Sequence, residues 1–192
     1  MTYQEFKETV TAIARDMQIA DYELYYTEGD STSVEIYKDE VKSYSVEEEL
    51  GVCFRCIVDG RAGYASTENL TTQEARSLVQ RAYENAGSME SEEIALLYQK
   101  GDTYATLPEN TDVRPTGREL TDKAMELQKE MYALDSRVAD GTQAYMAYGR
   151  QKYALCNSNG LDLEDEISMA RCYGMALVAD GEEMYDGFQN KR

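Results

Sequence analysis

The chain has 192 residues, of which 42% are hydrophobic and only two are proline, so it is long enough and apolar enough to bury a core. Aspartate and glutamate number 37 against 19 lysines and arginines, which gives a formal net charge of −18. This charge argues against a nucleic-acid-binding protein, because phosphate backbones are bound by clustered basic side chains.

The first predicted element is a helix that begins after Thr2. Glu5 follows three residues later, which is the pattern of a capping box, in which each side chain accepts a hydrogen bond from the other residue's backbone N–H. One buried face is predicted by the apolar residues that follow at spacings of three and four, which are Phe6, Val10, Ile13 and Met17.

A β-hairpin is predicted next, over 52–58 and 61–66. The two segments flank Asp59-Gly60, a dipeptide that favours the positive φ values of tight turns. Alternation along the first strand puts Val52, Phe54, Cys56 and Val58 on an apolar face and Cys53, Arg55 and Ile57 on the opposite face.

A second helix is predicted over about 71–86. Thr71 and Glu74 give its start signal, and Gly87 stands where a left-handed C-terminal cap is expected. Its predicted buried face consists of Ala75, Leu78, Val79, Ala82 and Ala86.

Residues 88–115 are polar, lack a sustained period and contain both prolines, so we predict a linker with at most one short helix. A third helix follows over about 117–134, with Thr116 and Glu119 as its start signal. Its predicted buried face consists of Leu120, Ala124, Leu127, Met131 and Leu134.

Two more hairpins are predicted after the third helix. Asn159-Gly160 is expected to join strand 152–158 to strand 161–168, and Asp180-Gly181 to join strand 172–179 to the segment around 184–188.

These elements predict an α+β fold, with antiparallel sheets and packed helices. We divide the chain into an N-terminal α+β domain (1–87), a linker (88–115) and a second α+β unit (116–192). The run from Gly51 to Gly60 is echoed by the run from Gly174 to Gly181, which suggests two similar helix-plus-hairpin units and a duplication. Chance similarity between glycine-containing hairpins is the alternative.

Two polar motifs are candidate contacts for an extended peptide, Ser66-Thr67 and Asn157-Ser158-Asn159-Gly160. The alternative for both is structural. The first motif finishes a strand before a helix start, and the second forms a hairpin turn in which Asn and Gly adopt positive φ and Ser bonds to nearby backbone.

The sequence contains no histidine, which is the usual general base near neutral pH and the usual nitrogen ligand of catalytic zinc. A Ser-His-Asp or Cys-His mechanism within this chain is therefore excluded, and Ser66 is not predicted to be a nucleophile. We predict no catalytic residue and no metal ligand in this chain.

Four cysteines include one Cys-x-x-Cys, formed by Cys53 and Cys56. A redox pair of this kind normally opens a helix, whereas here the two residues lie on opposite faces of a predicted strand. A zinc site would have to recruit Cys156 and Cys172 from far along the chain. We predict four reduced, mostly buried thiols.

Carboxylates cluster at 47–49 and 162–166, where we expect solvated strand faces rather than a cation site, because neither cluster matches a calcium loop. Sixteen tyrosines suit wet interfaces and chamber linings, or ordinary half-buried strand packing. The candidates are Tyr64, Tyr145, Tyr148, Tyr173 and Tyr185.

Apolar runs are short, and the longest, 175–179, falls far short of the ~20 residues that span a bilayer. The N-terminal segment is acidic and amphipathic, so we expect no secretion signal and no membrane partner. We expect a cytoplasmic protein.

Two stretches of the sequence resemble the TldD/PmbA family. The first comprises residues 33–41 and 50–70, with a glycine-led strand, an Asp-Gly turn and a Gly-Tyr-Ala-Ser-Thr exit. The second comprises Asn157-Ser-Asn-Gly160 and 178–187, similar to the Asn-Ser-x-Gly and Gly-(Asp/Glu)-Met signatures that close the family's N-terminal half. The 51–60 strand and the short linker resemble the PmbA (TldE) branch more closely.

The resemblance implies that this chain is the N-terminal half of a longer protein. The family's His-Glu-x-x-x-His zinc motif belongs to the C-terminal half, which is missing here, so zinc is expected in a partner or in that half, and no cofactor in this chain. The family's zinc-bearing TldD-type and zinc-free PmbA-type subunits form a heterodimeric peptidase. The implied partners are peptide substrates and a TldD-type subunit, or a second copy of the full-length chain, and no nucleic acid.

The sequence therefore favours a non-catalytic N-terminal part of a PmbA/TldE-type subunit, which forms chamber wall and subunit interface in a peptide-processing zinc metallopeptidase. Two alternatives remain open. One is the N-terminal half of a zinc-bearing TldD-type catalytic subunit. The other is an acidic binding module for a protein partner, in gyrase or toxin/antitoxin regulation.

Overall fold

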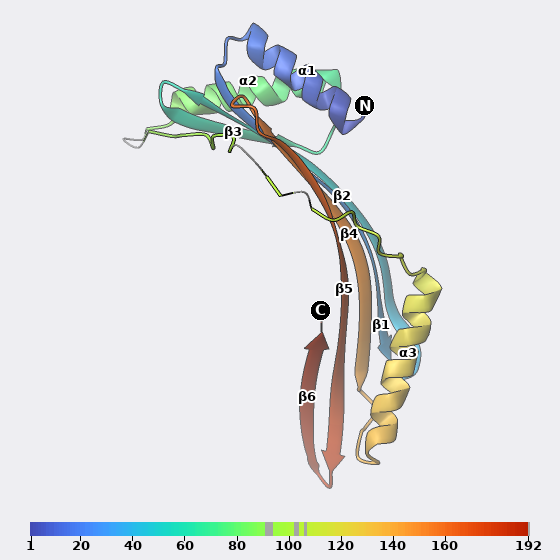
Figure 1. Ribbon diagram of the computed structural model, residues 1–192. Coiled ribbons are helices and arrows are strands. Elements are labelled where there is room, and N and C mark those ends of the chain that lie inside the picture. The colour runs from blue at the N-terminus through green and yellow to red at the C-terminus, as the bar shows by residue number, and fades with distance from the viewer. Residues whose placement is uncertain (91–93, 102–103, 106, 192) are drawn as a thin grey trace. The chain divides into compact units, whose positions relative to one another are not determined.

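The structure is a computed structural model that describes residues 1–90, 94–101, 104–105 and 107–191 (Figure 1). The elements follow one another as α1 (Tyr3–Asp16), β1 (Asp21–Tyr37), β2 (Glu40–Val58), β3 (Arg61–Thr67), α2 (Thr72–Ser88), α3 (Gly117–Leu134), β4 (Gln143–Asn157), β5 (Asp162–Asp180) and β6 (Glu183–Lys191).

The strands form one six-stranded sheet in the order β3-β2-β1-β4-β5-β6. The predicted α+β class with antiparallel strands and packed helices is confirmed. Two details differ from the prediction. Strands 161–168 and 172–179 are parts of the single strand β5, and the strands of the two predicted halves join because β1 and β4 are neighbours. The duplication stays a prediction.

Contacts divide the chain into two compact units that are discontinuous in sequence. Unit 1 comprises residues 1–28, 49–109 and 152–166, and unit 2 comprises residues 29–48, 110–151 and 167–192. Each of β1, β2, β4 and β5 contributes residues to both units. The sequence-based ranges 1–87, 88–115 and 116–192 stay a prediction.

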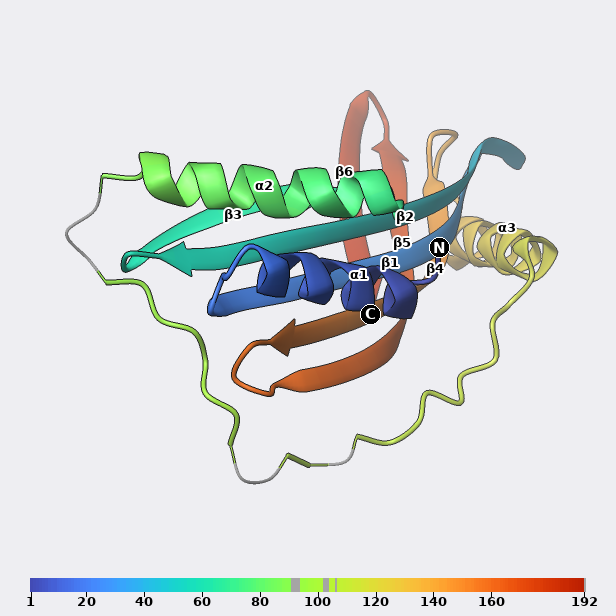
Figure 2. The ribbon, with the colours of Figure 1, turned by 90° about the horizontal axis from the view of Figure 1, so that it is seen from above.

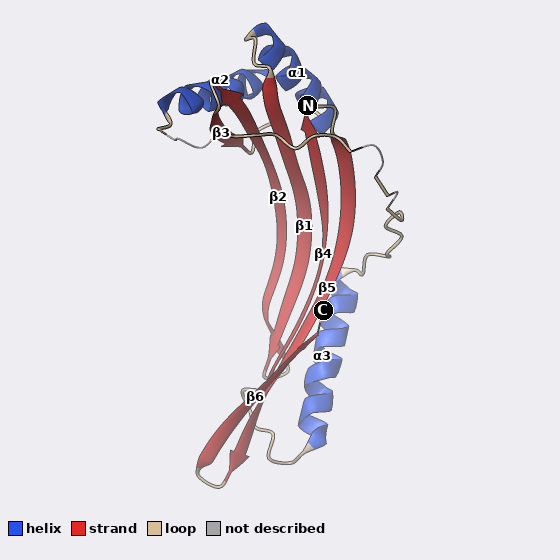
Figure 3. Ribbon diagram, turned by 60° about the vertical axis from the view of Figure 1, so that its left-hand side comes forward, coloured by secondary structure: helices blue, strands red, loops and turns tan. Residues whose placement is uncertain are grey.

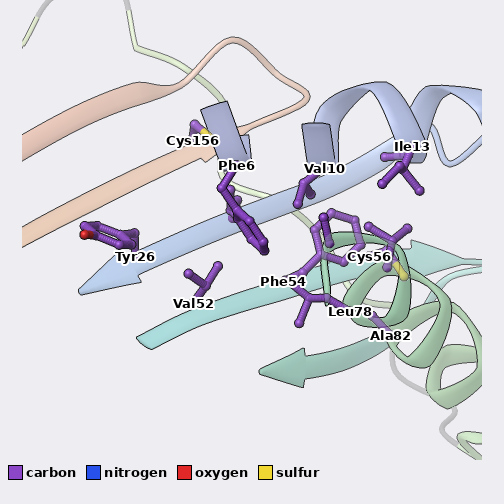
Figure 4. Packing of buried hydrophobic residues seen from close by; sticks show 14 of the residues in the cluster. Phe6, Val10, Ile13, Tyr26, Val52, Phe54, Cys56, Leu78, Ala82 and Cys156 are labelled. Carbon is purple, nitrogen blue, oxygen red and sulfur yellow. The ribbon is translucent and has the colours of Figure 1, made fainter. Parts of the chain in front are cut away.

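In unit 1, α1 and α2 contact each other and pack on one face of the strands (Figure 4). The predicted buried faces of both helices and of strand 52–58 meet in this core, with Phe6, Val10, Leu78, Ala82, Val52, Phe54 and Cys56 at most 1% exposed. Arg55 and the other odd-numbered residues of this strand therefore lie on the face away from the helices. Burial of these side chains is the main favourable term in the folding of the unit.

Gly63 on β3 sets how closely α2 approaches the sheet. It pairs with Cys56 on β2, and a Cβ atom built at Gly63 would lie 2.0 Å from the carbonyl oxygen of Ala82 and 2.3 Å from the amide nitrogen of Ala86. Only glycine allows the helix backbone to pack at this distance.

In unit 2, α3 packs along the strands (Figure 3). Leu120 and Ala124 join Val34 and Ile36 in its core, as the helical spacing predicts. Leu134 is an exception, because it is the last residue of α3 and its side chain is 82% exposed rather than buried.

Three predicted caps and one predicted turn can be compared with the structure, together with one turn that was not predicted. Capping boxes start α1 at Thr2 and α3 at Thr116. The predicted left-handed cap at Gly87 is wrong, because α2 continues through Ser88 and Gly87 does not have a positive φ. Asp59 and Gly60 adopt φ values of 49° and 79°, whereas the β1–β2 turn at Lys38 and Asp39 has φ values of 53° and 60° without any glycine.

Candidate functional site

The Asn157–Gly160 motif forms the turn between β4 and β5 in unit 1. The Asn157 side-chain oxygen accepts hydrogen bonds from the backbone N–H groups of Asn159 (3.0 Å) and Leu161 (3.1 Å), and Gly160 has a φ of 84°. The Asn157 amide nitrogen donates to the carbonyl oxygen of Tyr98 at 2.9 Å. Asn157 is only 8% exposed, so its polar atoms are used inside the chain.

Ser158 fastens this turn to the start of β1. Its hydroxyl accepts a hydrogen bond from the backbone N–H of Tyr22 at 3.2 Å, and its own backbone N–H donates to the carbonyl oxygen of Tyr22 at 2.9 Å. Asn159 donates its side-chain amide to the carbonyl oxygen of Tyr98 at 3.4 Å. Both asparagine side chains therefore bind the backbone of residue 98, while contact with a substrate stays a prediction.

Ser66 and Thr67 lie at the end of β3 and connect it to α2. The Thr67 hydroxyl donates to the carboxylate of Glu74 at 3.2 Å, and the Ser66 carbonyl oxygen accepts from the Arg81 guanidinium at 3.1 Å. These contacts run to α2, whereas those of Asn157 run to residue 98. The structure therefore does not gather the two motifs around one site.

Arg55 makes polar contacts that the sequence analysis did not predict. The alternation of strand 52–58 predicted only that its side chain lies on the face opposite Phe54 and Cys56. Its guanidinium lies 3.4 Å from the Glu23 carboxylate, 3.4 Å from the Tyr64 hydroxyl and 3.4 Å from the carbonyl oxygen of Leu96. The alternation along strand 52–58 signals that Arg55 faces away from the helices. No sequence pattern signals its contact with Leu96.

The four cysteines are free thiols, and the predicted separation of Cys53 and Cys56 onto opposite strand faces is confirmed. Burial raises the pKa of Cys56 to about 11 and also raises the pKa values of Cys53 and Cys156. Since the thiolate is the reactive form, these side chains are poor nucleophiles at neutral pH.

Alkylation with iodoacetamide at pH 8 is expected to label Cys56 at least about tenfold more slowly in the folded chain than in urea, because burial limits access and raises its pKa. The raised pKa of Cys56 also makes the free energy of unfolding fall as the pH rises above about 8.5. The reason is that the thiol loses its proton at a lower pH in the unfolded chain than in the folded chain. Peptide mapping by mass spectrometry gives the rate at each site, and half-buried Cys172 is the internal control. Equal rates for Cys56 in the two states would contradict the buried position.

Within the described ranges, no group of three or more histidine, cysteine, aspartate or glutamate side chains is placed to hold a metal ion. In the 162–166 cluster, Asp162 pairs with Lys7 at 3.0 Å and Glu164 pairs with Lys152 at 3.1 Å. These residues do not fit a zinc site. None of the helices that the structure describes is long and apolar enough to cross a membrane.

The candidate tyrosines have several environments. In unit 2, the rings of Tyr145 and Tyr173 stack at 4.7 Å, and Tyr173 also contacts Phe188 at 5.3 Å. Tyr148 is buried and donates to Ser168, whereas Tyr64 and Tyr185 are more than half exposed. The tyrosines therefore serve in ordinary packing as well as on the surface.

Two family models match the sequence in successive segments. One, described as PmbA/TldA metallopeptidase domain 1, matches residues 22–86. The other, described as PmbA/TldA metallopeptidase central domain, matches residues 113–190. No curated protein matches the sequence significantly.

Three crystal structures share the fold. They are a protein from Thermotoga maritima described as a candidate modulator of a DNA gyrase (TM-score 0.84, 20% identity), TldE from Thermococcus kodakarensis (0.81, 17%) and a candidate modulator of DNA gyrase from Bacteroides thetaiotaomicron (0.79, 18%). The matches cover 99%, 96% and 99% of this chain but only 43%, 43% and 45% of those chains. This chain therefore spans less than half the length of these structures.

Proposed function

Because the chain belongs to the PmbA/TldD family, we propose that it is the N-terminal, non-catalytic part of a PmbA/TldE-type subunit in a heterodimeric zinc metallopeptidase that processes or degrades peptides. In this proposal the chain forms part of the chamber wall and of the subunit interface. It acts in the cytoplasm.

One observation carries the proposal. The sequence matches the first and the central metallopeptidase domains in order, yet it contains no histidine. Zinc in peptidases needs nitrogen or carboxylate ligands gathered at one point, and the described residues gather no such set. The zinc of the complex is then supplied from outside this chain, by a TldD-type partner or by the part of the relatives' length that this chain does not cover. The PmbA-like 51–60 strand and short linker support the assignment to this branch.

The experiment is native mass spectrometry with zinc quantification on the full-length parent protein, purified from its own source. The expected result is a complex of two different chains, with zinc bound to the other chain. Zinc bound by the parent chain would instead assign it to the TldD-type catalytic branch. A parent protein with neither zinc nor a second subunit would favour the acidic binding module.

The non-catalytic role is tested with the 192-residue chain itself. After dialysis against zinc, it is expected to leave a fluorogenic peptide mixture uncleaved, while the assembled complex cleaves the mixture and loses activity with a chelator. Chelator-sensitive cleavage by the 192-residue chain alone would overturn the proposal.

A further inference from the structure

An extended segment of the chain crosses the ends of the strands in unit 1. Figure 2 shows this light-green segment running from the β2–β3 turn toward the β4–β5 turn. We call residues 94–100 the strap. The backbone N–H of Ala95 donates to the carbonyl oxygen of Gly60 at 2.8 Å, and the carbonyl oxygen of Tyr98 accepts from Asn157 and Asn159.

The strap is held mainly through its backbone. Arg55 donates to the carbonyl oxygen of Leu96, and the two asparagines donate to that of Tyr98, two residues farther along. Side-chain donors that bind every second carbonyl group suit any extended peptide, because these contacts do not depend on the peptide's side chains.

One strap side chain supplies the apolar contact. Leu97 is only 8% exposed, whereas Leu96 is 79% exposed and Tyr98 is 61% exposed. This alternation is that of an extended chain with one anchor residue facing inward. The strap thus buries little apolar surface for a segment with several large hydrophobic residues, and its attachment is correspondingly weak.

Arg55, the donor beneath Leu96, is incompletely satisfied by the strap. The distances from the Arg55 guanidinium to Glu23, to the Tyr64 hydroxyl and to the Leu96 carbonyl oxygen are each 3.4 Å, which is long for a charge-assisted hydrogen bond. The Arg55 Nε atom is buried and makes no hydrogen bond within the part of the chain that the structure describes. A buried donor without a partner is costly, so a better-placed backbone carbonyl would be favoured here.

We propose that Arg55, Asn157 and Asn159 form a binding site for an extended peptide with an apolar anchor residue, and that the strap occupies this site until a peptide displaces it. The proposal rests on the proposed function for its ligand class, since a peptidase subunit handles peptides. Its test needs neither zinc nor a partner subunit, so the failure of either proposal can be recognised separately.

The test uses a fluorescein-labelled peptide with the strap sequence, residues 94–101, titrated with the 192-residue chain and followed by fluorescence anisotropy. The substitution Leu97→Ser is expected to tighten peptide binding by about tenfold, because it weakens the strap that competes for the site. Adding Asn159→Ala to this variant is expected to weaken binding by about fivefold through the loss of one donor. Asn159 is chosen because Asn157 also closes the turn.

Leu96→Ser is the matched control, since it changes the same residue type one position away on a side chain that faces solvent. It is expected to leave peptide affinity unchanged. Equal affinities of the Leu96→Ser and Leu97→Ser variants, or no effect of Asn159→Ala, would overturn the proposal. So would the absence of binding by both the unsubstituted chain and the Leu97→Ser variant.

A second measurement uses the unsubstituted chain, in case Leu97→Ser disturbs folding. Saturating unlabelled peptide is expected to speed hydrogen exchange at the Ala95 amide at least about fivefold, because displacement of the strap breaks its bond to Gly60. Unchanged Ala95 exchange in the presence of bound peptide would show that the peptide binds elsewhere, which also overturns the proposal.

Discussion

Replacing Gly63 by alanine is expected to lower the free energy of unfolding by about 3 kcal/mol or more. The added Cβ atom would lie 2.0 Å from the Ala82 carbonyl oxygen, and the nearest atoms all belong to the α2 backbone. A flexible side chain could rotate away, but a helix backbone must move as a whole. Such a movement separates α2 from β3 and loosens the contacts of Leu78 and Ala82 in the core of unit 1.

The measurement is urea unfolding followed by far-ultraviolet circular dichroism, with Gly87→Ala as the control. Gly87 lies within α2 without a positive φ, and a Cβ atom there meets nothing within 4 Å. Alanine at this position is expected to stabilise the chain by about 0.5–1 kcal/mol, because it has the higher helix propensity. If the two substitutions have similar effects, the close approach at Gly63 does not limit the packing of α2.

Replacing Gln128 by methionine is expected to lower the free energy of unfolding by about 2–3 kcal/mol. Gln128 lies on α3 and is 1% exposed. Its amide nitrogen donates to the carbonyl oxygen of Thr142 at 2.7 Å, and its side-chain oxygen accepts from the backbone N–H of Asp39 at 3.0 Å. Methionine fills a similar volume but leaves these backbone groups without a partner, including a carbonyl group in the interior of unit 2.

Gln80→Met is the matched control on α2. Gln80 is exposed and bonds to Glu84 on the same helix at 2.8 Å. This change is expected to alter stability by no more than about 0.5 kcal/mol. The same urea titration compares the two variants. A loss at Gln128 no larger than that at Gln80 would show that its hydrogen bonds to Thr142 and Asp39 add nothing beyond the volume of the side chain.

The helices could be predicted well because their signals are local. Thr2 with Glu5 and Thr116 with Glu119 form the boxes that the spacing predicts, and the alanine-rich face of α2 is buried throughout. Gln128 shows the limit of this approach. It follows Ala124 by one turn and so lies on the buried face, yet glutamine in a sequence pattern indicates the solvent side.

The long strands were predicted from two kinds of signal, the alternation of a half-buried strand and the dipeptide of a tight turn. Strand 52–58 alternates clearly because Phe54 and Cys56 face the core, whereas the first half of β5 is mostly exposed and was predicted as strand 161–168 from the Asn159-Gly160 turn, without the continuation into 172–179. The β1–β2 hairpin escaped prediction because Lys38 and Asp39 adopt positive φ without a glycine to signal it.

The candidate site was predicted in part. The Asn157–Gly160 motif was singled out for amide side chains that can bind an extended peptide, and in the structure those amides bind the backbone of residue 98. The identity of that partner could not be predicted, since residues 94–100 carry no periodic pattern and side-chain contacts to backbone leave no trace in sequence. The two asparagines and residue 98 come together only when the chain adopts its tertiary fold.

The sharing of β1, β2, β4 and β5 between the two units has a consequence for how the protein can be divided. A protease nick near residue 102 would yield a fragment with β1–β3 and a fragment with β4–β6, and each fragment would carry strands of both units. Neither unit would be released intact by such a cut. The two fragments are instead complementary halves of a split protein, which must reassociate along the β1–β4 seam to complete both cores.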